Sequence, residues 1–144
     1  MKHILFVCTG NTCRSPVPEG KFNSLAESER IDANASSSGI YANIGEEIST
    51  NAKNALSEIG IVFSHNACQI THDSVKNADM IIGITKNHAE TLIAAFPEYA
   101  DKIFSFPADI SDPYGGNLDV YRKCRDEITE GIKTIINYLK ENHE

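Results

Sequence analysis

The sequence lacks long hydrophobic runs and has no excess of positive charge. None of its apolar runs is long enough to cross a bilayer, and its N-terminus carries no cleavable signal pattern. Its formal net charge is -7, whereas a protein that binds nucleic acid usually presents a basic face. These absences predict a cytoplasmic protein with no membrane association and no nucleic-acid partner.

Cysteine is also scarce, and its spacing excludes several kinds of site. No two cysteines form a C-x-x-C pair and no Cys/His cluster has zinc spacing, so the sequence implies no metal or other cofactor. A Walker loop and a G-x-G-x-x-G dinucleotide motif are absent as well. Without an export signal, the thiols are expected to be reduced or reactive rather than joined as structural disulfides. The four cysteines are Cys8, Cys13, Cys68 and Cys124.

The composition predicts one domain spanning residues 1–144. A chain of 144 residues has room for a proper core, and a hydrophobic content of 41% is too high for a disordered chain. Strand and helix patterns alternate, which predicts a three-layer α/β fold: a four-stranded parallel sheet with helices on both faces. Strands are expected at His3–Val7, Ala33–Ile40, Ala78–Ile84 and Lys102–Phe106, and helices at Pro16–Glu29, Thr50–Ile59, Lys86–Phe96 and Asn117–Leu139.

Two of these helices carry clear apolar faces, which are expected to pack on the core. The face of the Thr50–Ile59 helix consists of Ala52, Ala55, Leu56 and Ile59. The face of the C-terminal helix consists of Leu118, Tyr121, Ile128, Ile132, Ile135 and Ile136.

The segment between the first strand and the first helix has the features of an anion site. It reads Val7-Cys8-Thr9-Gly10-Asn11-Thr12-Cys13-Arg14-Ser15-Pro16, with Ser15 as the expected helix cap and Pro16 at the first helical position. Backbone N–H groups of such a turn can converge on one point, and the helix dipole adds positive potential there. Arg14 can hold two phosphate oxygens at once. This segment is therefore predicted to be a phosphate-binding loop.

Cys8 is the predicted nucleophile of this loop. A thiol near a helix N-terminus and an arginine ionises readily, and a thiolate within an anion cradle is aimed at phosphorus. The alternative is a buried structural cysteine beside an ordinary turn. Cys13, in the same loop, could form a reversible disulfide that shields an oxidised Cys8, or could be a small buried residue that lets the loop close.

The motif Cys8-x5-Arg14-Ser15-Pro16 resembles the low-molecular-weight protein phosphatases. Thr12 and the run Asp112-Pro113-Tyr114-Gly115-Gly116 look most like the bacterial protein-arginine phosphatases, since tyrosine-specific members usually carry an aliphatic residue in place of Thr12. The resemblance implies hydrolysis of a phosphoprotein through a phosphocysteine intermediate, with inorganic phosphate as product. It also implies that the phosphoryl group is held by Thr9, Gly10, Asn11, Thr12, Cys13 and Arg14.

The chemistry requires an acid, and Asp112 is the best candidate. Phenol has a pKa of about 10 and guanidine one above about 12, so neither departs well without a proton. Asp112 lies in a Pro- and Gly-flanked loop of the kind that often carries catalytic groups. Asp109 is the rival, and an Asp-Pro step can also simply start a turn. In the family that the motif resembles, the acid lies in a matching Asp-Pro step.

The resemblance further implies a supporting network behind the loop. Ser37-Ser38-Gly39 is similar to a strand-end motif that buttresses the loop, although a plain polar loop is the alternative reading. His65 is expected to join Asn11, Ser15 and Ser37 in hydrogen bonds, whereas a histidine in a loop is more often exposed. Ser15 is expected to donate a hydrogen bond to the sulfur of Cys8.

Thr12 is the predicted determinant of the substrate. A hydroxyl at the pocket wall suits a polar guanidinium and penalises an apolar ring, while Tyr114 offers an aromatic wall that suits either group. Phosphoarginine is therefore favoured over phosphotyrosine. A thioredoxin-coupled arsenate reductase would need a further cysteine pair in a shared motif, and a non-catalytic phosphate-binding module would not need Cys8, Arg14 and Asp112 together.

Overall fold

The computed structural model describes residues 2–108 and 110–141. Within this part of the chain, strands and helices alternate as expected. The strands are β1 (Lys2–Cys8), β2 (Ala33–Gly39), β3 (Met80–Gly83) and β4 (Ile103–Ser105). The α-helices are α1 (Pro16–Ser28), α2 (Thr50–Ser57), α3 (His72–Asn77), α4 (Lys86–Ala95) and α5 (Leu118–Glu141), and a 3-10 helix, η1, covers Pro97–Lys102.

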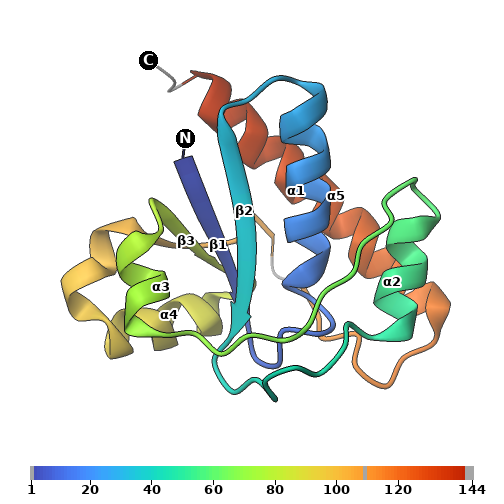
Figure 1. Ribbon diagram of the computed structural model, residues 1–144, viewed down its shortest axis with the longest axis horizontal. Helices are drawn as coiled ribbons and strands as arrows, with labels where there is room; N and C mark the ends of the chain where they lie inside the picture. Colours follow the sequence, from blue (N-terminus) through green and yellow to red (C-terminus); the bar gives the residue numbers. More distant parts are fainter. Residues whose placement is uncertain (1, 109, 142–144) are drawn as a thin grey trace.

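The four strands form one parallel sheet in the order β2-β1-β3-β4. Helices α1, α2 and α5 lie on one face of the sheet, and α3 and α4 lie on the other (Figure 1). The three-layer α/β fold predicted from the sequence is therefore confirmed. All strands of such a sheet end at the same edge, which is where ligands bind in this class of fold.

The central strand β1 is buried on both sides, which explains its continuous apolar run. Ile4 and Phe6 face the core under α1 and α5, whereas Leu5 and Val7 face the smaller core under α3 and α4. The ring of Phe6 packs edge-on against Phe22, with the ring centroids 6.2 Å apart. Because β1 is held from both faces, the residue at its end has a fixed position.

Several element boundaries differ from the expectations. Helix α2 ends at Ser57, and Ile59 is 37% exposed, so the prediction that Ile59 belongs to the buried face is wrong. Helix α3 was not expected, because it is only six residues long and Val75 is its one buried side chain. A capping box between Thr71 and Ser74 starts α3 in place of an apolar pattern. The 3-10 helix η1 was missed for a similar reason, since it buries no side chain.

Helix α5 packs across α1 and α2 through the apolar face predicted for it. The buried residues include Tyr121, Ile128, Ile132, Ile135 and Ile136, while Leu118 is only partly buried. Among residues 2–108 and 110–141, no helix combines the length and hydropathy that a membrane span needs.

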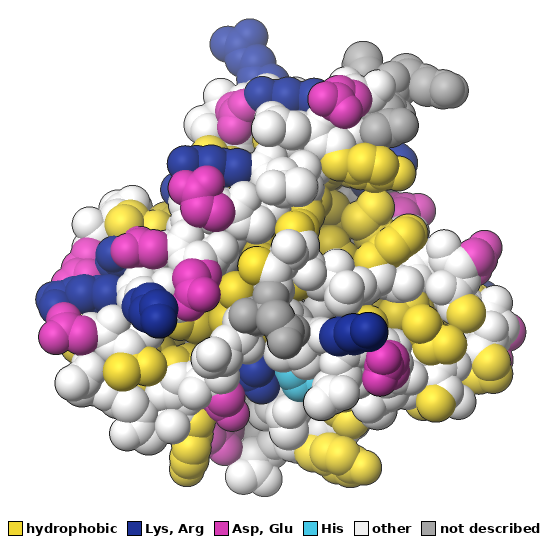
Figure 2. Space-filling model, turned by 180° about the vertical axis from the view of Figure 1, so that it is seen from behind, with side chains coloured by type: hydrophobic (Ala, Val, Ile, Leu, Met, Phe, Trp, Pro, Cys, Tyr) yellow, Lys and Arg dark blue, Asp and Glu magenta, His cyan; other side chains and the backbone are white. Residues whose placement is uncertain are grey.

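The face seen in Figure 2 mixes charges of both signs, with Lys and Arg side chains lying beside Asp and Glu. A shallow apolar hollow of about 230 Å³ lies between the β3–β4 edge of the sheet and α5. Its lining includes Met80, Phe104, Ile135 and Tyr138. The polar loop described next lies elsewhere, at the carboxyl edge of the sheet.

Candidate active site

The loop from Cys8 to Ser15 joins the end of β1 to the start of α1. Cys8 is 3% exposed, and the main-chain N–H of Asn11 donates a hydrogen bond to its Sγ atom over 3.2 Å. The loop can turn back on the sulfur because Asn11 has a φ of 61°, in the left-handed region that asparagine tolerates better than most residues. The geometry thus places a main-chain donor against the sulfur of the predicted nucleophile.

Ser15 contacts the sulfur of Cys8 as expected, but it does not make the side-chain helix cap that was also expected of it. It occupies the position before α1, but its side chain makes no capping hydrogen bond. Its Oγ lies instead 2.9 Å from Sγ of Cys8 and accepts a hydrogen bond from Nδ2 of Asn11 over 2.9 Å. Because the hydroxyl oxygen of Ser15 accepts this hydrogen bond from Asn11, the hydroxyl hydrogen can be donated to the sulfur of Cys8. Pro16, which has no N–H, reduces the need for a cap.

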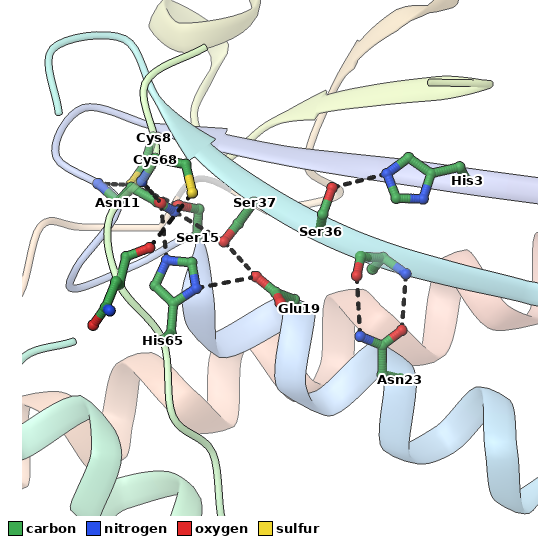
Figure 3. A network of polar contacts seen from close by, with 12 residues as sticks. His3, Cys8, Asn11, Ser15, Glu19, Asn23, Ser36, Ser37, His65 and Cys68 are labelled. Carbon is green, nitrogen blue, oxygen red and sulfur yellow. Dashed lines mark hydrogen bonds and ion pairs between the residues drawn. The ribbon is translucent and has the colours of Figure 1, made fainter. Parts of the chain in front are cut away.

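The side chain of Asn11 ties the loop to two other segments, the end of β2 and residues 65–68 (Figure 3). Its Nδ2 atom donates to the hydroxyls of Ser15 and Ser37, each over 2.9 Å. Its Oδ1 atom lies 2.8 Å from Nε2 of His65 and accepts from the main-chain N–H of Cys68 over 2.8 Å. All four hydrogen-bonding positions of the amide are therefore used. The structure brings together Asn11, Ser15, Ser37 and His65, the four residues implied by the resemblance.

Glu19 extends this network and was missed from the sequence. The hydroxyl of Ser37 donates to Oε1 of Glu19 over 2.5 Å, and Nδ1 of His65 lies 3.6 Å from the same oxygen. Burial raises the pKa of Glu19 to about 7, against a smaller lowering by the hydrogen bond from Ser37. Burial also lowers the pKa of His65. The sequence signal that could have found Glu19 is its spacing from Ser15. Residues four positions apart lie on the same side of a helix, so Glu19 and Ser15 both face the loop.

We expect Glu19→Gln to remove much of the pH dependence of stability. Because the folded-state pKa of Glu19 is raised from 4.5 to about 7, its stabilising contribution is complete below pH 4.5 and is lost as the pH rises through about 7. At about 1.4 kcal/mol per pKa unit, the wild type should lose roughly 3 kcal/mol more than the variant between these limits. Urea unfolding of both proteins near pH 4 and near pH 8 measures this difference. Glu27→Gln, at an exposed position of α1, is the matched control, and parallel profiles for wild type and Glu19→Gln would contradict the prediction.

The end of β2 also supports the loop through main-chain hydrogen bonds. The main-chain N–H groups of Ile40 and Tyr41 donate to the carbonyl oxygens of Cys8 and Thr9, each over 2.9 Å. A Cβ atom on Gly39 would lie 2.5 Å from the carbonyl oxygen of Thr9, so only glycine allows this approach. Residues 37–39 therefore form a strand end, not the plain polar loop considered as the alternative.

Arg14 connects the phosphate loop to the loop that carries Asp112. Its guanidinium is largely buried, and Nη1 donates to the carbonyl oxygen of Ile110 over 2.9 Å. Its Nη2 atom lies 3.9 Å from Oδ2 of Asp112, whose other oxygen accepts from the main-chain N–H of Tyr114 over 3.1 Å. The side chain of Asp112 is 56% exposed and can therefore meet a ligand. The rival acid, Asp109, lies outside the described residues.

The three residues predicted to carry the chemistry line one pocket of about 360 Å³. Asn11, predicted to hold the phosphoryl group, and the supporting residues Ser15, Ser37 and His65 are not part of its lining. They lie behind the loop and hold its shape. Sequence reasoning missed Tyr41, Asn43 and Glu46, because residues 41–47 looked only like a turn. The lining consists of Cys8, Thr9, Gly10, Thr12, Cys13, Arg14, Tyr41, Asn43, Glu46, Asp112 and Tyr114.

Cys13 faces the same pocket but is held by a different partner. Its Sγ atom lies 3.2 Å from the hydroxyl of Tyr121, and burial, with a further contribution from this contact, raises the pKa of Tyr121 to about 12. The phenol therefore keeps its proton and can donate it to the sulfur. All four cysteines are free thiols. A protective disulfide between Cys8 and Cys13 stays a prediction, beside the simpler role of Cys13 as a buried loop residue.

Comparison with known proteins identifies the family. Residues 3–144 match the family model described as low molecular weight phosphotyrosine protein phosphatase. A protein-arginine-phosphatase of Bacillus subtilis is 35% identical, the match covering 96% of this chain and 97% of that protein. A mutant of the YwlE arginine phosphatase with a phosphorylated active-site serine superimposes with a TM-score of 0.95 at 34% identity, covering 98% of this chain and 97% of the other. A low molecular weight protein tyrosine phosphatase from T. tengcongensis superimposes with a TM-score of 0.93 at 39% identity, covering 96% and 100%. The chain therefore belongs to the low-molecular-weight phosphotyrosine protein phosphatase family and is a cysteine-based phosphoprotein phosphatase.

Proposed function

We propose that this phosphatase acts on phosphoarginine in proteins, with phosphotyrosine as the alternative substrate. The observation that carries the proposal is the position of Thr12 in the pocket wall, in a lining shared with Cys8 and Asp112. Thr12 is 8% exposed, and its Oγ1 atom lies 3.7 Å from Sγ of Cys13, a weak partner that leaves the hydroxyl able to accept a stronger hydrogen bond from a ligand. A guanidinium can supply this bond with an N–H donor, whereas the face of a phenyl ring cannot.

The distribution of charge in the pocket supports the same substrate. Arg14 and the start of α1 make the loop side positive, while Glu46 and Asp112 bring carboxylates to the same lining. Phosphoarginine pairs an anionic phosphoryl group with a guanidino group rich in donors, and phosphotyrosine pairs the same anion with an apolar ring. The exposed ring of Tyr114 can stack on either group.

The names of the relatives support a phosphatase, but they include enzymes for both phosphoarginine and phosphotyrosine. The Bacillus subtilis relative is named a protein-arginine-phosphatase, and the T. tengcongensis structure is named a tyrosine phosphatase. These names favour a phosphatase over an arsenate reductase or a non-catalytic phosphate-binding module. The choice between the two phosphorylated residues therefore depends on the pocket wall.

In the proposed first step, the thiolate of Cys8 attacks phosphorus and forms a phosphocysteine. The hydroxyl of Ser15 and the N–H of Asn11 lie against the sulfur and stabilise its negative charge. Arg14, at the same loop, neutralises the equatorial oxygens of the transition state. The carboxyl group of Asp112 gives its proton to the leaving nitrogen or phenolic oxygen, so the P–N bond breaks to release a guanidinium or the P–O bond breaks to release a phenol.

In the proposed second step, Asp112 acts as a base. Its carboxylate takes a proton from a water molecule that attacks phosphorus, the S–P bond breaks, and inorganic phosphate leaves. The hydrogen bonds from Ser15 and Asn11 make the thiolate a better leaving group. Arg14 serves both steps, because its contacts with Ile110 and Asp112 keep the acid loop beside the phosphate loop.

We expect Thr12→Ile to shift the preference from phosphoarginine toward phosphotyrosine. Removing the hydroxyl deprives the guanidinium of a partner and gives the ring an apolar wall, so the ratio of the two kcat/KM values should fall by about 10- to 100-fold. Steady-state kinetics on two peptides that differ only in the phosphorylated residue measure this ratio. Thr12→Val, close in shape to threonine, separates the loss of polarity from the added bulk. An unchanged ratio in both variants would refute the role given to Thr12.

A further inference from the structure

His88 contacts the phosphate loop from the side opposite the Asn11 network. It lies in the first turn of α4 and is only 6% exposed. Its Nε2 atom lies 3.0 Å from Oγ1 of Thr9, the residue that directly follows the nucleophile. No step of the mechanism above uses this histidine.

The fold brings His88 to the loop through a close approach of α4 to β3. Gly83, the last residue of β3, pairs with Val7 of β1. A Cβ atom on Gly83 would lie 2.6 Å from the main-chain nitrogen of Ala89 and 3.0 Å from Cβ of His88. The absence of a side chain at Gly83 thus lets the first turn of α4 rest on the strand end beside the loop.

The start of α4 also fixes which ring nitrogen of His88 carries the proton. The main-chain N–H of Thr85 points at Nδ1 over 3.2 Å, so Nδ1 must act as an acceptor. The hydroxyl of Thr85 lies 3.0 Å from the same nitrogen, and it accepts from the main-chain N–H of His88 in a capping box. The neutral ring therefore carries its hydrogen on Nε2, which donates it to Thr9.

This contact leaves the hydroxyl of Thr9 with one free lone pair and one hydrogen. The side chain of Thr9 is exposed and lines the pocket that holds Cys8. It also lines an adjoining polar hollow of about 620 Å³, together with Arg14, Tyr41 and His88. A substrate in the pocket therefore meets a hydroxyl whose position is fixed by a buried ring behind it.

We propose that His88 is a positioning residue that holds the hydroxyl of Thr9 for a hydrogen bond with the leaving group, which makes Thr9 a second determinant of specificity. A guanidino group can donate an N–H to the free lone pair of Thr9, whereas the phenolic leaving group has no N–H and can only accept the hydroxyl hydrogen. The direction of this preference rests on the proposed function. The coupling between His88 and Thr9 does not, because it follows from their contact alone.

The experiment compares kcat/KM on matched phosphoarginine and phosphotyrosine peptides for a set of variants. Thr9→Val removes the hydroxyl and His88→Ala removes the ring. His88→Gln keeps a donor near the position of Nε2, whereas His88→Asn keeps an acceptor for Thr85 but cannot reach Thr9. The double variant Thr9→Val/His88→Ala closes a thermodynamic cycle. Thermal unfolding of each protein separates a loss of fold from a loss of the contact.

We expect Thr9→Val, His88→Ala and His88→Asn each to lower kcat/KM on phosphoarginine about tenfold, the loss of one hydrogen bond, with a smaller change on phosphotyrosine. The double variant should lose no more than the single ones, and His88→Gln should recover most of the activity. Multiplicative losses, or equal losses on both substrates, would overturn the inference. A wild type that prefers phosphotyrosine would overturn the proposed function instead. The coupling between Thr9 and His88 would then be measured from kcat/KM on the phosphotyrosine peptide.

Discussion

Replacing Cys8 with serine is expected to abolish turnover while leaving the fold intact. The hydroxyl that replaces the thiol is close in size, so the contacts with Ser15 and the N–H of Asn11 can persist. An alcohol is a far weaker nucleophile than a thiolate at neutral pH, and its phosphate ester is harder to break in the second step. The loss of kcat should be at least about 10⁴-fold, as for the removal of other catalytic nucleophiles.

Intact-mass measurement provides a second test of the same substitution. If serine attacks slowly and its ester does not hydrolyse, the variant should accumulate one phosphoryl group per chain after long incubation with substrate. The YwlE mutant with a phosphorylated active-site serine, which has the same fold, is a precedent for such a species. Cys124→Ala removes a buried thiol of α5 that is not part of the pocket lining and should keep activity. Turnover by Cys8→Ser at the wild-type rate would contradict the assignment of the nucleophile.

Asp112→Asn is expected to give the second-largest loss. The amide keeps an oxygen that can accept from the N–H of Tyr114, so the loop should hold its shape. It cannot deliver a proton to the leaving group, and general acid catalysis of this kind contributes about 10²- to 10⁴-fold to a rate. A fall in kcat within that range is therefore expected on phosphopeptides, with little change in substrate affinity.

The identity of the leaving group distinguishes an acid from a structural aspartate. A substrate such as para-nitrophenyl phosphate needs little protonation to depart, so its first step should be much less affected by Asp112→Asn than that of phosphoarginine. The second step still lacks its base, and a burst of nitrophenol followed by slow turnover is expected. Asp101→Asn, at an exposed position of η1, is the matched control. Equal losses on all substrates without a burst would show that Asp112 only holds the loop.

The fold could be predicted because its signals are local and repeated. Within the predicted strand His3–Val7, the four residues Ile4–Val7 are all apolar because the strand is covered on both faces, and this marked a central parallel strand. The periodic apolar face of α5 marked a long helix against the core. Helix α3 and η1 could not be found in this way, because they bury one side chain or none and so leave no periodic pattern.

The candidate site was only partly predictable for a related reason. Cys8, Arg14 and Ser15 lie in one continuous motif, so their proximity follows from the sequence alone. Glu19 and His88 reach the loop from separate helices, and a glutamate or histidine on a helix is far more often exposed than buried. The contact of Ser15 with the Cys8 sulfur was expected, whereas the absence of a side-chain helix cap from Ser15 was not, because it depends on the position of Asn11. Contacts that depend on how elements pack leave no mark in a local pattern.

The hydrogen bonds of the Asn11 side chain have a consequence for how the enzyme folds during synthesis. The loop lies within the first residues of the chain, yet its central amide is held by His65, 54 positions further along. Contacts between such distant positions form late, because the intervening chain must first give up its freedom. A nascent chain that has emerged only as far as α2 therefore contains Cys8 but lacks the contacts of Asn11 with His65 and Cys68 that hold the loop. Capture of a phosphoryl group therefore has to wait until the segment around His65 has docked on Asn11.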